Sequence, residues 1–173
     1  MLDRELITHA ESQVRKYLED GLLTKVKPEQ KILDVLIKNA EESLLLAQDI
    51  LINNKSDLWV IVTSYYAMFY MANTVLYKKG LKVGDTSAHA VTANALIVYV
   101  RKSLKESLIE EFTQAMSEAQ STMKAEEILK AYFLEKKKRG DFQYNMTLTL
   151  KRAKARTSFD RAKEFTFALR KLL

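Results

Sequence analysis

The chain has 173 residues, the length of a single domain. Its 47% hydrophobic and 29% charged residues provide enough apolar side chains for a core and exclude a disordered chain. Four glycines and one proline are too few for the turns of an all-β domain. The remaining residues are mostly helix formers and predict an all-α fold.

Absent residues exclude several kinds of site. The chain has no cysteine, so it has no disulfide framework, thiolate metal site or cysteine nucleophile. Two histidines, His9 and His89, leave little for a metal site, and we predict no metal and no cofactor. There is no apolar run of about 18 residues to span a membrane and no apolar signal-peptide segment at the start. We therefore expect a cytoplasmic protein.

The excess positive charge is concentrated at the end of the chain. Residues 124–173 contain 14 basic and 6 acidic residues, a balance of +8, whereas residues 1–123 contain 14 basic and 16 acidic residues, a balance of −2. A segregated excess of this kind suggests an anionic partner. Nucleic acid is the first candidate, and an acidic protein or membrane surface is the next.

Two amphipathic helices are predicted before residue 55. The first ends at Gly21, which is placed as a C-cap glycine, and a polar link leads to Pro28 in the first turn of the second. The second helix ends at the pair Asn53-Asn54. Their apolar residues recur at helical spacing: Leu6, Ala10, Val14 and Leu18 in the first, and Leu33, Leu36, Ile37, Ala40, Leu44, Ala47 and Leu51 in the second.

The segment from Trp59 to Tyr77 is apolar or aromatic almost all round, and its length predicts a helix rather than a strand. A helix without a polar face must be surrounded by other helices or by a second subunit. Asp57 is its predicted N-cap. We expect its tyrosines to pack in the core and Ser64 to donate a hydrogen bond to a carbonyl one turn earlier.

The rest of the chain predicts further helices of the same bundle. A connection over residues 80–87 leads to a helix that begins after Ser87 and runs through Tyr99, and residues 104–119 either continue that helix or form a kinked neighbour. Ser121-Thr122 is a candidate cap for a helix over 124–139, which Gly140 ends. A final helix covers about 148–172. The predicted division is an added N-terminal helical segment, residues 1–27, and a bundle, residues 28–173.

A helical wheel of the last helix places four cations in one narrow row, roughly opposite its apolar face and without an acid among them. Two interpretations are about equally favoured. The row is either a solvated surface or a surface that binds nucleic acid. Its members are Arg152, Arg156, Lys163 and Arg170.

Three segments together follow the pattern of a known family. They are Ser64-Tyr-Tyr-Ala-Met-Phe69 in the apolar helix, His89 at the start of the next helix, and Arg139-Gly-Asp-Phe-Gln-Tyr144 before the last. This pattern resembles the HEPN (higher eukaryotes and prokaryotes nucleotide-binding) domain, over roughly residues 30–173. The resemblance implies an up-and-down helical bundle that often forms a homodimer and handles nucleotides or RNA in the cytoplasm. It also implies a small nucleotidyltransferase partner, with this chain as the toxin-like half of a toxin–antitoxin pair.

Active members of that family are metal-independent ribonucleases with an arginine followed four to six residues later by a histidine. After Arg139 these positions hold Tyr144, Asn145 and Met146, so the histidine is missing. Ribonuclease chemistry needs a base near neutral pH, and tyrosine titrates near pH 10. His89 is the other candidate base, although its place in the first turn of a helix favours the simpler interpretation that it orients the loop before it. Arg139 is suited to hold a phosphate, or simply to complete its helix C-terminus.

Three functions remain open from the sequence. The leading hypothesis is a protein that binds RNA or a nucleotide through the basic row and the Arg139 segment, without efficient ribonuclease activity. The second is a weak endoribonuclease that uses Arg139 with His89 or Tyr144 as acid or base. The third is an interaction module in which the apolar helix over 59–77 and the N-terminal helix bury a dimer or hetero-complex surface.

Overall fold

The structure is a computed structural model that describes residues 3–136 and 148–173, with side chains described for 3–124 and 152–173. It is mostly helical, with six α-helices in these ranges and one small two-stranded sheet, which confirms the predicted all-α bundle. The elements in chain order are α1 (Arg4–Glu19), β1 (Leu23–Lys25), α2 (Gln30–Ile52), α3 (Asp57–Lys78), β2 (Leu81–Val83), α4 (Ala88–Tyr99), a 3₁₀ turn η1 (Arg101–Ser103), α5 (Glu106–Lys136) and α6 (Leu148–Arg170).

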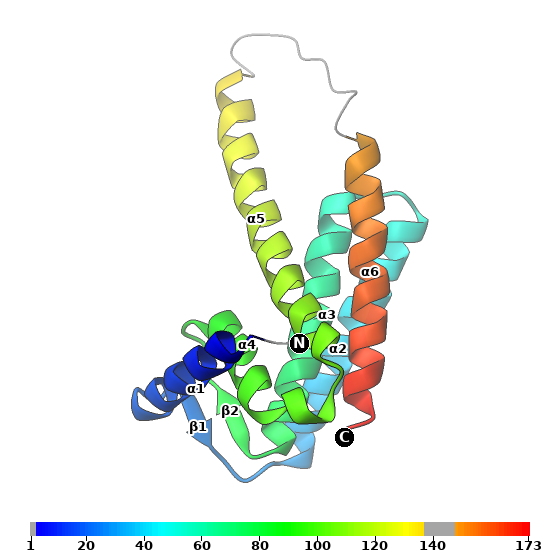
Figure 1. Cartoon of the computed structure of the whole chain (residues 1–173). Helices are drawn as coiled ribbons and strands as arrows, with labels where there is room; N and C mark the ends of the chain where they lie inside the picture. The colour runs from blue at the N-terminus through cyan, green and yellow to red at the C-terminus, as the bar shows by residue number, and fades with distance from the viewer. Residues whose placement is uncertain (1–2, 137–147) are drawn as a thin grey trace.

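Helix α3 is the centre of the bundle (Figure 1). It packs against α2, α4, α5 and α6, and fourteen of its residues are buried, as its uncharged sequence predicts. The rings of Phe112 and Phe165 stack at 5.4 Å and close the core between α5 and α6. Met68 and Leu76 of α3 are fully buried in the same cluster. Burial of most of its circumference explains why this helix has no charged face.

The small sheet is the main feature that the sequence did not predict. β1 pairs antiparallel with β2, with Leu23 opposite Val83 and Lys25 opposite Leu81. Each strand has three residues, too few for an alternating pattern to be recognised. Gly21, at a positive φ of 72°, ends α1 as expected and turns the chain into β1. The sheet thereby joins residues 1–27 to the segment between α3 and α4.

Two predicted helix boundaries are wrong. The N-cap of α3 is Ser56, whose hydroxyl accepts a hydrogen bond from the backbone of Trp59, and Asp57 lies in the first turn. Helix α5 runs without interruption through Ser121 and Thr122, so these residues do not cap a separate helix. The break instead lies earlier, where η1 and an extended Leu104 separate α4 from α5. Figure 1 shows the far half of α5 leaning away from α6.

The prediction for Ser64 is also wrong. Its hydroxyl is buried and has no hydrogen-bond partner in the structure as described. The carbonyl one turn earlier, that of Val60, accepts from Thr63 Oγ1 at 3.4 Å, and the same hydroxyl also reaches Trp59 O at 2.6 Å. In this turn of the helix the hydroxyl of Thr63, rather than that of Ser64, donates to the backbone.

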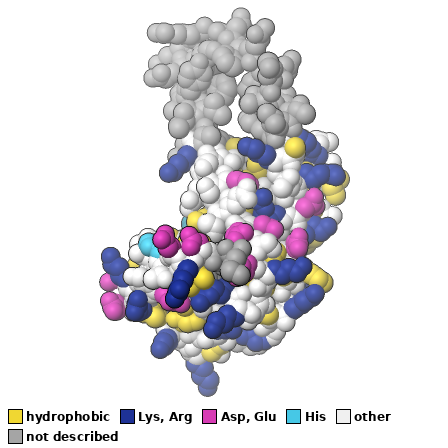
Figure 2. Space-filling model, viewed as in Figure 1, with side chains coloured by type: hydrophobic (Ala, Val, Ile, Leu, Met, Phe, Trp, Pro, Cys, Tyr) yellow, Lys and Arg dark blue, Asp and Glu magenta, His cyan; other side chains and the backbone are white. Residues whose placement is uncertain are grey.

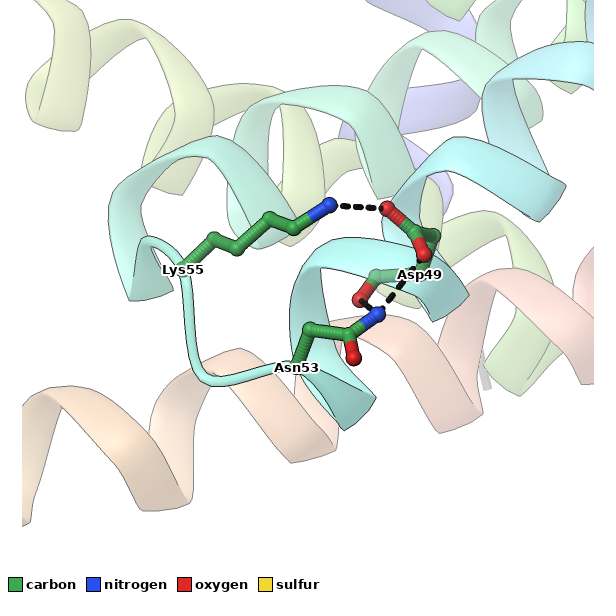
Figure 3. A network of polar contacts seen from close by, with 3 residues as sticks. All are labelled: Asp49, Asn53 and Lys55. Carbon is green, nitrogen blue, oxygen red and sulfur yellow. Dashed lines mark hydrogen bonds and ion pairs between the residues drawn. The ribbon is translucent and has the colours of Figure 1, made fainter.

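A polar network holds the corner between α2 and α3 (Figure 3). Lys55 Nζ lies 2.8 Å from Asp49 Oδ2, and Asn53 Nδ2 donates to Asp49 Oδ1 at 2.7 Å. The hydrogen bond and charge of Lys55 lower the pKa of Asp49. The chain turns at Asn54, which has a positive φ of 52°. These exposed contacts cap the end of α2, while the packing of α2 along α3 sets the arrangement of the hairpin.

Candidate functional site

A cavity of about 380 Å³ lies between α2, α3, β2 and the start of α4. One side of the cavity is formed by α3, a second by Ile32 and Leu36 of α2, and the rest by the segment from Leu81 to His89. The cavity brings one predicted site residue, His89, together with aromatic and polar side chains. The most relevant of them are Tyr66, Phe69, Tyr70, Asn73, Lys82 and Asp85.

The wall from α3 arises from helical spacing. Residues 66, 70, 73 and 77 follow each other at intervals of three or four, so they project from one side of the helix. Tyr66, Tyr70 and Asn73 are half-buried, which leaves part of each side chain open to the cavity. Tyr66 and Tyr70 have ring centroids 6.1 Å apart. The sequence predicted that these tyrosines would pack inside the core. In the structure they instead form a row of amphipathic side chains along the cavity.

His89 is held among the aromatic rings of α3. Its Nδ1 lies 2.7 Å from the hydroxyl of Tyr65, and its ring centroid lies 4.6 Å from that of Phe69. Burial lowers the pKa of His89, so the neutral imidazole is favoured. The position in the first turn of α4 agrees with the sequence, but the pairing with Tyr65 was not predicted.

The hydrogen bond to Tyr65 determines which nitrogen of His89 is a donor. Burial raises the pKa of Tyr65 far above its usual value, so the phenol stays protonated. Within the described part of the chain, Nδ1 of His89 is the only acceptor for that proton. We therefore assign the neutral tautomer with its proton on Nε2. His89 then offers a ligand an N–H donor, and it is poorly prepared to act as a base.

Asn73 has a fixed orientation at the cavity wall. Its Nδ2 donates to the carbonyl of Phe69 at 2.9 Å, and its Oδ1 accepts from Thr92 Oγ1 at 3.3 Å. An amide nitrogen carries two hydrogens, so one N–H of Asn73 remains for a ligand. The side chain is thus a second positioned donor beside His89.

The small sheet places the charged rim of the cavity. The pairing of Leu23 with Val83 fixes the strand that carries Lys82, and the backbone N–H of Gly84 donates to Leu22 O at 2.9 Å. Lys82 and Asp85 are exposed and have no ion-pair partner among the described residues. A cation and a carboxylate are therefore available at the opening of the cavity.

The basic row of α6 borders α2, and three of its four members are exposed. Arg152 Nη1 is 3.1 Å from Asp57 Oδ1, and Arg152 Nη2 donates to the carbonyl of Leu51 at 2.6 Å. Arg170 forms an ion pair with Glu41 of α2. Two of the four cations are thus neutralised by carboxylates of their own chain. Figure 2 likewise shows Lys and Arg interspersed with Asp and Glu over the visible face.

The other two members of the row differ from each other. Lys163 lies over the ring of Phe159 at 5.6 Å and lines a cavity of about 510 Å³ between α2 and α6. This cavity is larger than the one at His89, but it is crossed by the Arg170–Glu41 pair and brings no predicted catalytic group together. Arg156 is exposed and has no partner among the described residues.

The remaining site predictions are not tested by the geometry. Arg139 and Tyr144 lie outside the described residues. Among the side chains described, those of residues 3–124 and 152–173, no group of three or more His, Asp or Glu is placed to hold a metal ion. No helix in these ranges is long and apolar enough to cross a membrane.

The chain was compared with protein families, curated proteins and solved structures. No family model, curated protein or solved structure matches the chain.

Sequence reasoning missed Asn73, Lys82 and Asp85 as site residues. The spacing of Tyr66, Tyr70 and Asn73 contains the relevant signal, because three side chains with polar tips recur on one side of an otherwise apolar helix. Lys82 and Asp85 carried no such signal. Their position depends on the pairing of β1 with β2, which the sequence did not reveal.

Proposed function

We propose that this chain is a HEPN-type protein that binds a nucleotide or single-stranded RNA in the cavity beside His89. The proposal depends on one observation: a single cavity combines the half-buried rings of Tyr66 and Tyr70 with two oriented N–H donors. Unpaired bases are recognised by aromatic stacking together with hydrogen bonds to their edges. Lys82 at the rim adds a cation for a phosphate.

Each part of the cavity has a distinct role in this proposal. Tyr66 and Tyr70 offer ring surface for stacking, which tolerates any base because every base has a π-face. Asn73 and the Nε2–H of His89 donate to acceptors on a base or ribose. The volume of about 380 Å³ falls in the range of small-molecule sites. This size is suited to one nucleotide rather than to a folded RNA.

The proposal assigns binding, not cleavage, to this cavity. A general base must have a free lone pair close to the proton that it removes. In the tautomer assigned to His89, Nδ1 accepts from Tyr65 and Nε2 carries the proton, so no lone pair is free. The motif histidine after Arg139 is absent from the sequence. Both observations favour a protein that holds RNA without efficient ribonuclease activity.

The proposed partners follow from the resemblance of Ser64–Phe69 and Arg139–Tyr144 to the HEPN pattern. They are a second copy of the chain and a small nucleotidyltransferase, with this chain as the toxin-like member of a toxin–antitoxin pair. A nucleotidyltransferase reading frame next to the gene, and co-purification of the two proteins, would support this part of the proposal.

Binding of a labelled single-stranded RNA of about 10 nucleotides tests the site. Wild-type protein should bind, and its affinity should fall steeply between about 50 and 200 mM salt as counterions are released. Lys82→Glu should weaken binding by about tenfold or more, or roughly 1.4 kcal/mol. Lys102→Glu makes the same charge change at an exposed residue of η1 and is the control. Its affinity for RNA should equal that of the wild type, apart from the small general effect of the altered net charge.

Two results would contradict the proposal. If wild-type protein fails to bind RNA at low salt, the proposed function is wrong. If Lys82→Glu and Lys102→Glu weaken binding equally, RNA is held elsewhere and the cavity is not the site. Tyr66→Leu provides a further check, because it removes the ring while keeping an apolar side chain, and it should weaken binding with little change in the salt dependence.

A further inference from the structure

Five lysines cluster at the end of the molecule that is formed by β1 and β2. Residues 22–28 and 78–84, the two strands with their flanking residues, contain five lysines and no acidic residue. The rest of residues 1–123 contains 9 basic and 16 acidic residues, so the balance of −2 for the whole range conceals this cluster. We call the cluster the lysine tip. Its members are Lys25, Lys27, Lys78, Lys79 and Lys82.

The sheet brings the lysine tip together from two segments that are far apart in the chain. The backbone N–H of Val26 donates to the carbonyl of Gly80 at 2.8 Å. Lys25 and Lys27 flank Val26 in the sequence, and Lys79 precedes Gly80. The hydrogen bond therefore places these three lysines at adjoining positions of the backbone. A Cβ on Gly80 would lie 3.0 Å from the carbonyl oxygen of Val26, so the two segments approach each other closely.

The charge of the lysine tip is not compensated within the described part of the chain. All five lysines are exposed, and none of them forms an ion pair with a described carboxylate. Clustered like charges create a positive potential that attracts anions. In Figure 2, Lys and Arg side chains without Asp or Glu occupy the lowest part of the visible face, where Figure 1 shows β1 and β2. A polyanion is therefore the kind of ligand that fits the tip.

The cavity at His89 indicates which polyanion is bound. Lys82 belongs to the lysine tip and also lines that cavity, together with Tyr66 and Tyr70. Proteins bind single-stranded nucleic acid with this combination of aromatic rings for the bases and a row of cations for the backbone. A membrane surface or an acidic protein would use the cations and leave the rings without a role. We propose that the lysine tip holds the sugar–phosphate backbone of a single-stranded RNA whose base occupies the cavity.

This inference rests on the proposed function and chooses between its two ligands, an oligonucleotide rather than a mononucleotide. Lys82 is opposite Thr24 in the sheet, and Lys27 lies three residues further along the chain, or about 10 Å of extended backbone. The cavity of about 380 Å³ has the size for one nucleotide. The phosphates of the following nucleotides therefore lie outside the cavity, where the lysines of the tip are.

Two pairs of lysines provide matched double variants. Lys25→Gln/Lys79→Gln removes two charges from the lysine tip and leaves Lys82 at the cavity in place. Lys102→Gln/Lys105→Gln removes two charges from exposed residues in and just after η1, outside the tip, and is the control. Fluorescence anisotropy measures the affinity of each protein for a labelled 10-nucleotide RNA and for a labelled dinucleotide, between about 50 and 200 mM salt.

The tip variant should bind the 10-nucleotide RNA about tenfold or more weakly than the wild type at about 100 mM salt. The slope of log affinity against log salt concentration should become shallower by about 1.4, because each phosphate contact of a single strand contributes about 0.7. The affinity of the tip variant for the dinucleotide should equal that of the wild type, which also shows that the fold and the cavity are intact. The control variant should match the wild type with both ligands, apart from the small general effect of net charge.

The inference is wrong if the two double variants weaken binding of the 10-nucleotide RNA equally, because the tip then acts only through net charge. It is also wrong if the wild type binds both ligands with the same affinity and salt slope, but in that case the cavity still holds a nucleotide and the proposed function stands. If neither ligand binds at low salt, the proposed function fails and this inference fails with it.

Vesicles of phosphatidylcholine with phosphatidylserine test the membrane as an alternative occupant. Wild-type protein should not sediment with them at about 150 mM salt, where the charges of a lipid surface are screened beyond about 8 Å. If the wild type sediments with the vesicles and the tip variant does not, while both bind RNA equally, the lysine tip is a membrane-binding surface and the inference is overturned.

Discussion

The pairing of Tyr65 with His89 joins the core of the bundle to the cavity wall. A buried phenol with a single acceptor holds the imidazole in its neutral form, because protonation of Nδ1 would leave the phenol proton without a partner. Burial of the ring acts in the same direction and lowers the pKa of His89. The two effects make His89 a fixed donor at neutral pH.

This pairing predicts a pH dependence of stability. A histidine whose pKa is lowered by folding stabilises the native state above its ordinary pKa of about 6.5, and that stabilisation is lost as the pH falls through the folded pKa. The free energy of unfolding should therefore fall between about pH 7.5 and 5 more in the wild type than in His89→Gln. Denaturant melts of both proteins measure the difference, and subtraction removes the contribution of Glu111, whose pKa is raised by burial.

A nitrogen NMR measurement separates the tautomer from the pKa. The neutral ring of His89 should show a protonated Nε2, and Tyr65→Phe should remove this preference while leaving the ring in place. A protonated Nδ1 in the wild type would contradict the assignment. The sequence placed His89 at the start of a helix, but it did not reveal that Tyr65, twenty-four residues earlier, would set its tautomer.

Among the elements, α6 shows the limit of a helical wheel. The wheel identified its apolar face and its four cations from sequence alone, but it shows one helix without its neighbours. The cations lie on the flank that meets α2, where Arg152 bridges the C-terminal carbonyl of Leu51 and the carboxylate of Asp57. This contact joins the end of α2 to the start of α3 and secures their corner.

The contact predicts unequal effects for two arginines one turn apart. Arg152→Met should lower the free energy of unfolding by about 1–2 kcal/mol, because it leaves a partly buried carboxylate and a carbonyl without their donor. In a chain of this length the Tm should fall by about 2–4 °C for each kcal/mol. Arg156→Met removes an exposed arginine without a partner in the described ranges and should change stability by less than about 0.5 kcal/mol.

The same two variants test the basic row as a nucleic-acid surface. If RNA is bound along the row, Arg156→Met should weaken binding and reduce its salt dependence, because Arg156 is the member left exposed and unpaired within the described residues. If the wild type and Arg156→Met bind RNA equally, the row does not bind nucleic acid, and its role is to join α6 to α2. Equal destabilisation by Arg152→Met and Arg156→Met would contradict the bridging role of Arg152.

In the whole molecule, local signals predicted most of the helices, and long-range contacts decided the rest. Gly21 and the uncharged run of α3 marked their elements correctly, because capping and burial act within a few turns. The β1–β2 pairing joins residues about 58 apart and has no local signature. Ser121 sits inside α5 although it favours caps, because helical context overrides a weak preference. The cavity was missed because its rim depends on the β1–β2 pairing, which has no local signature.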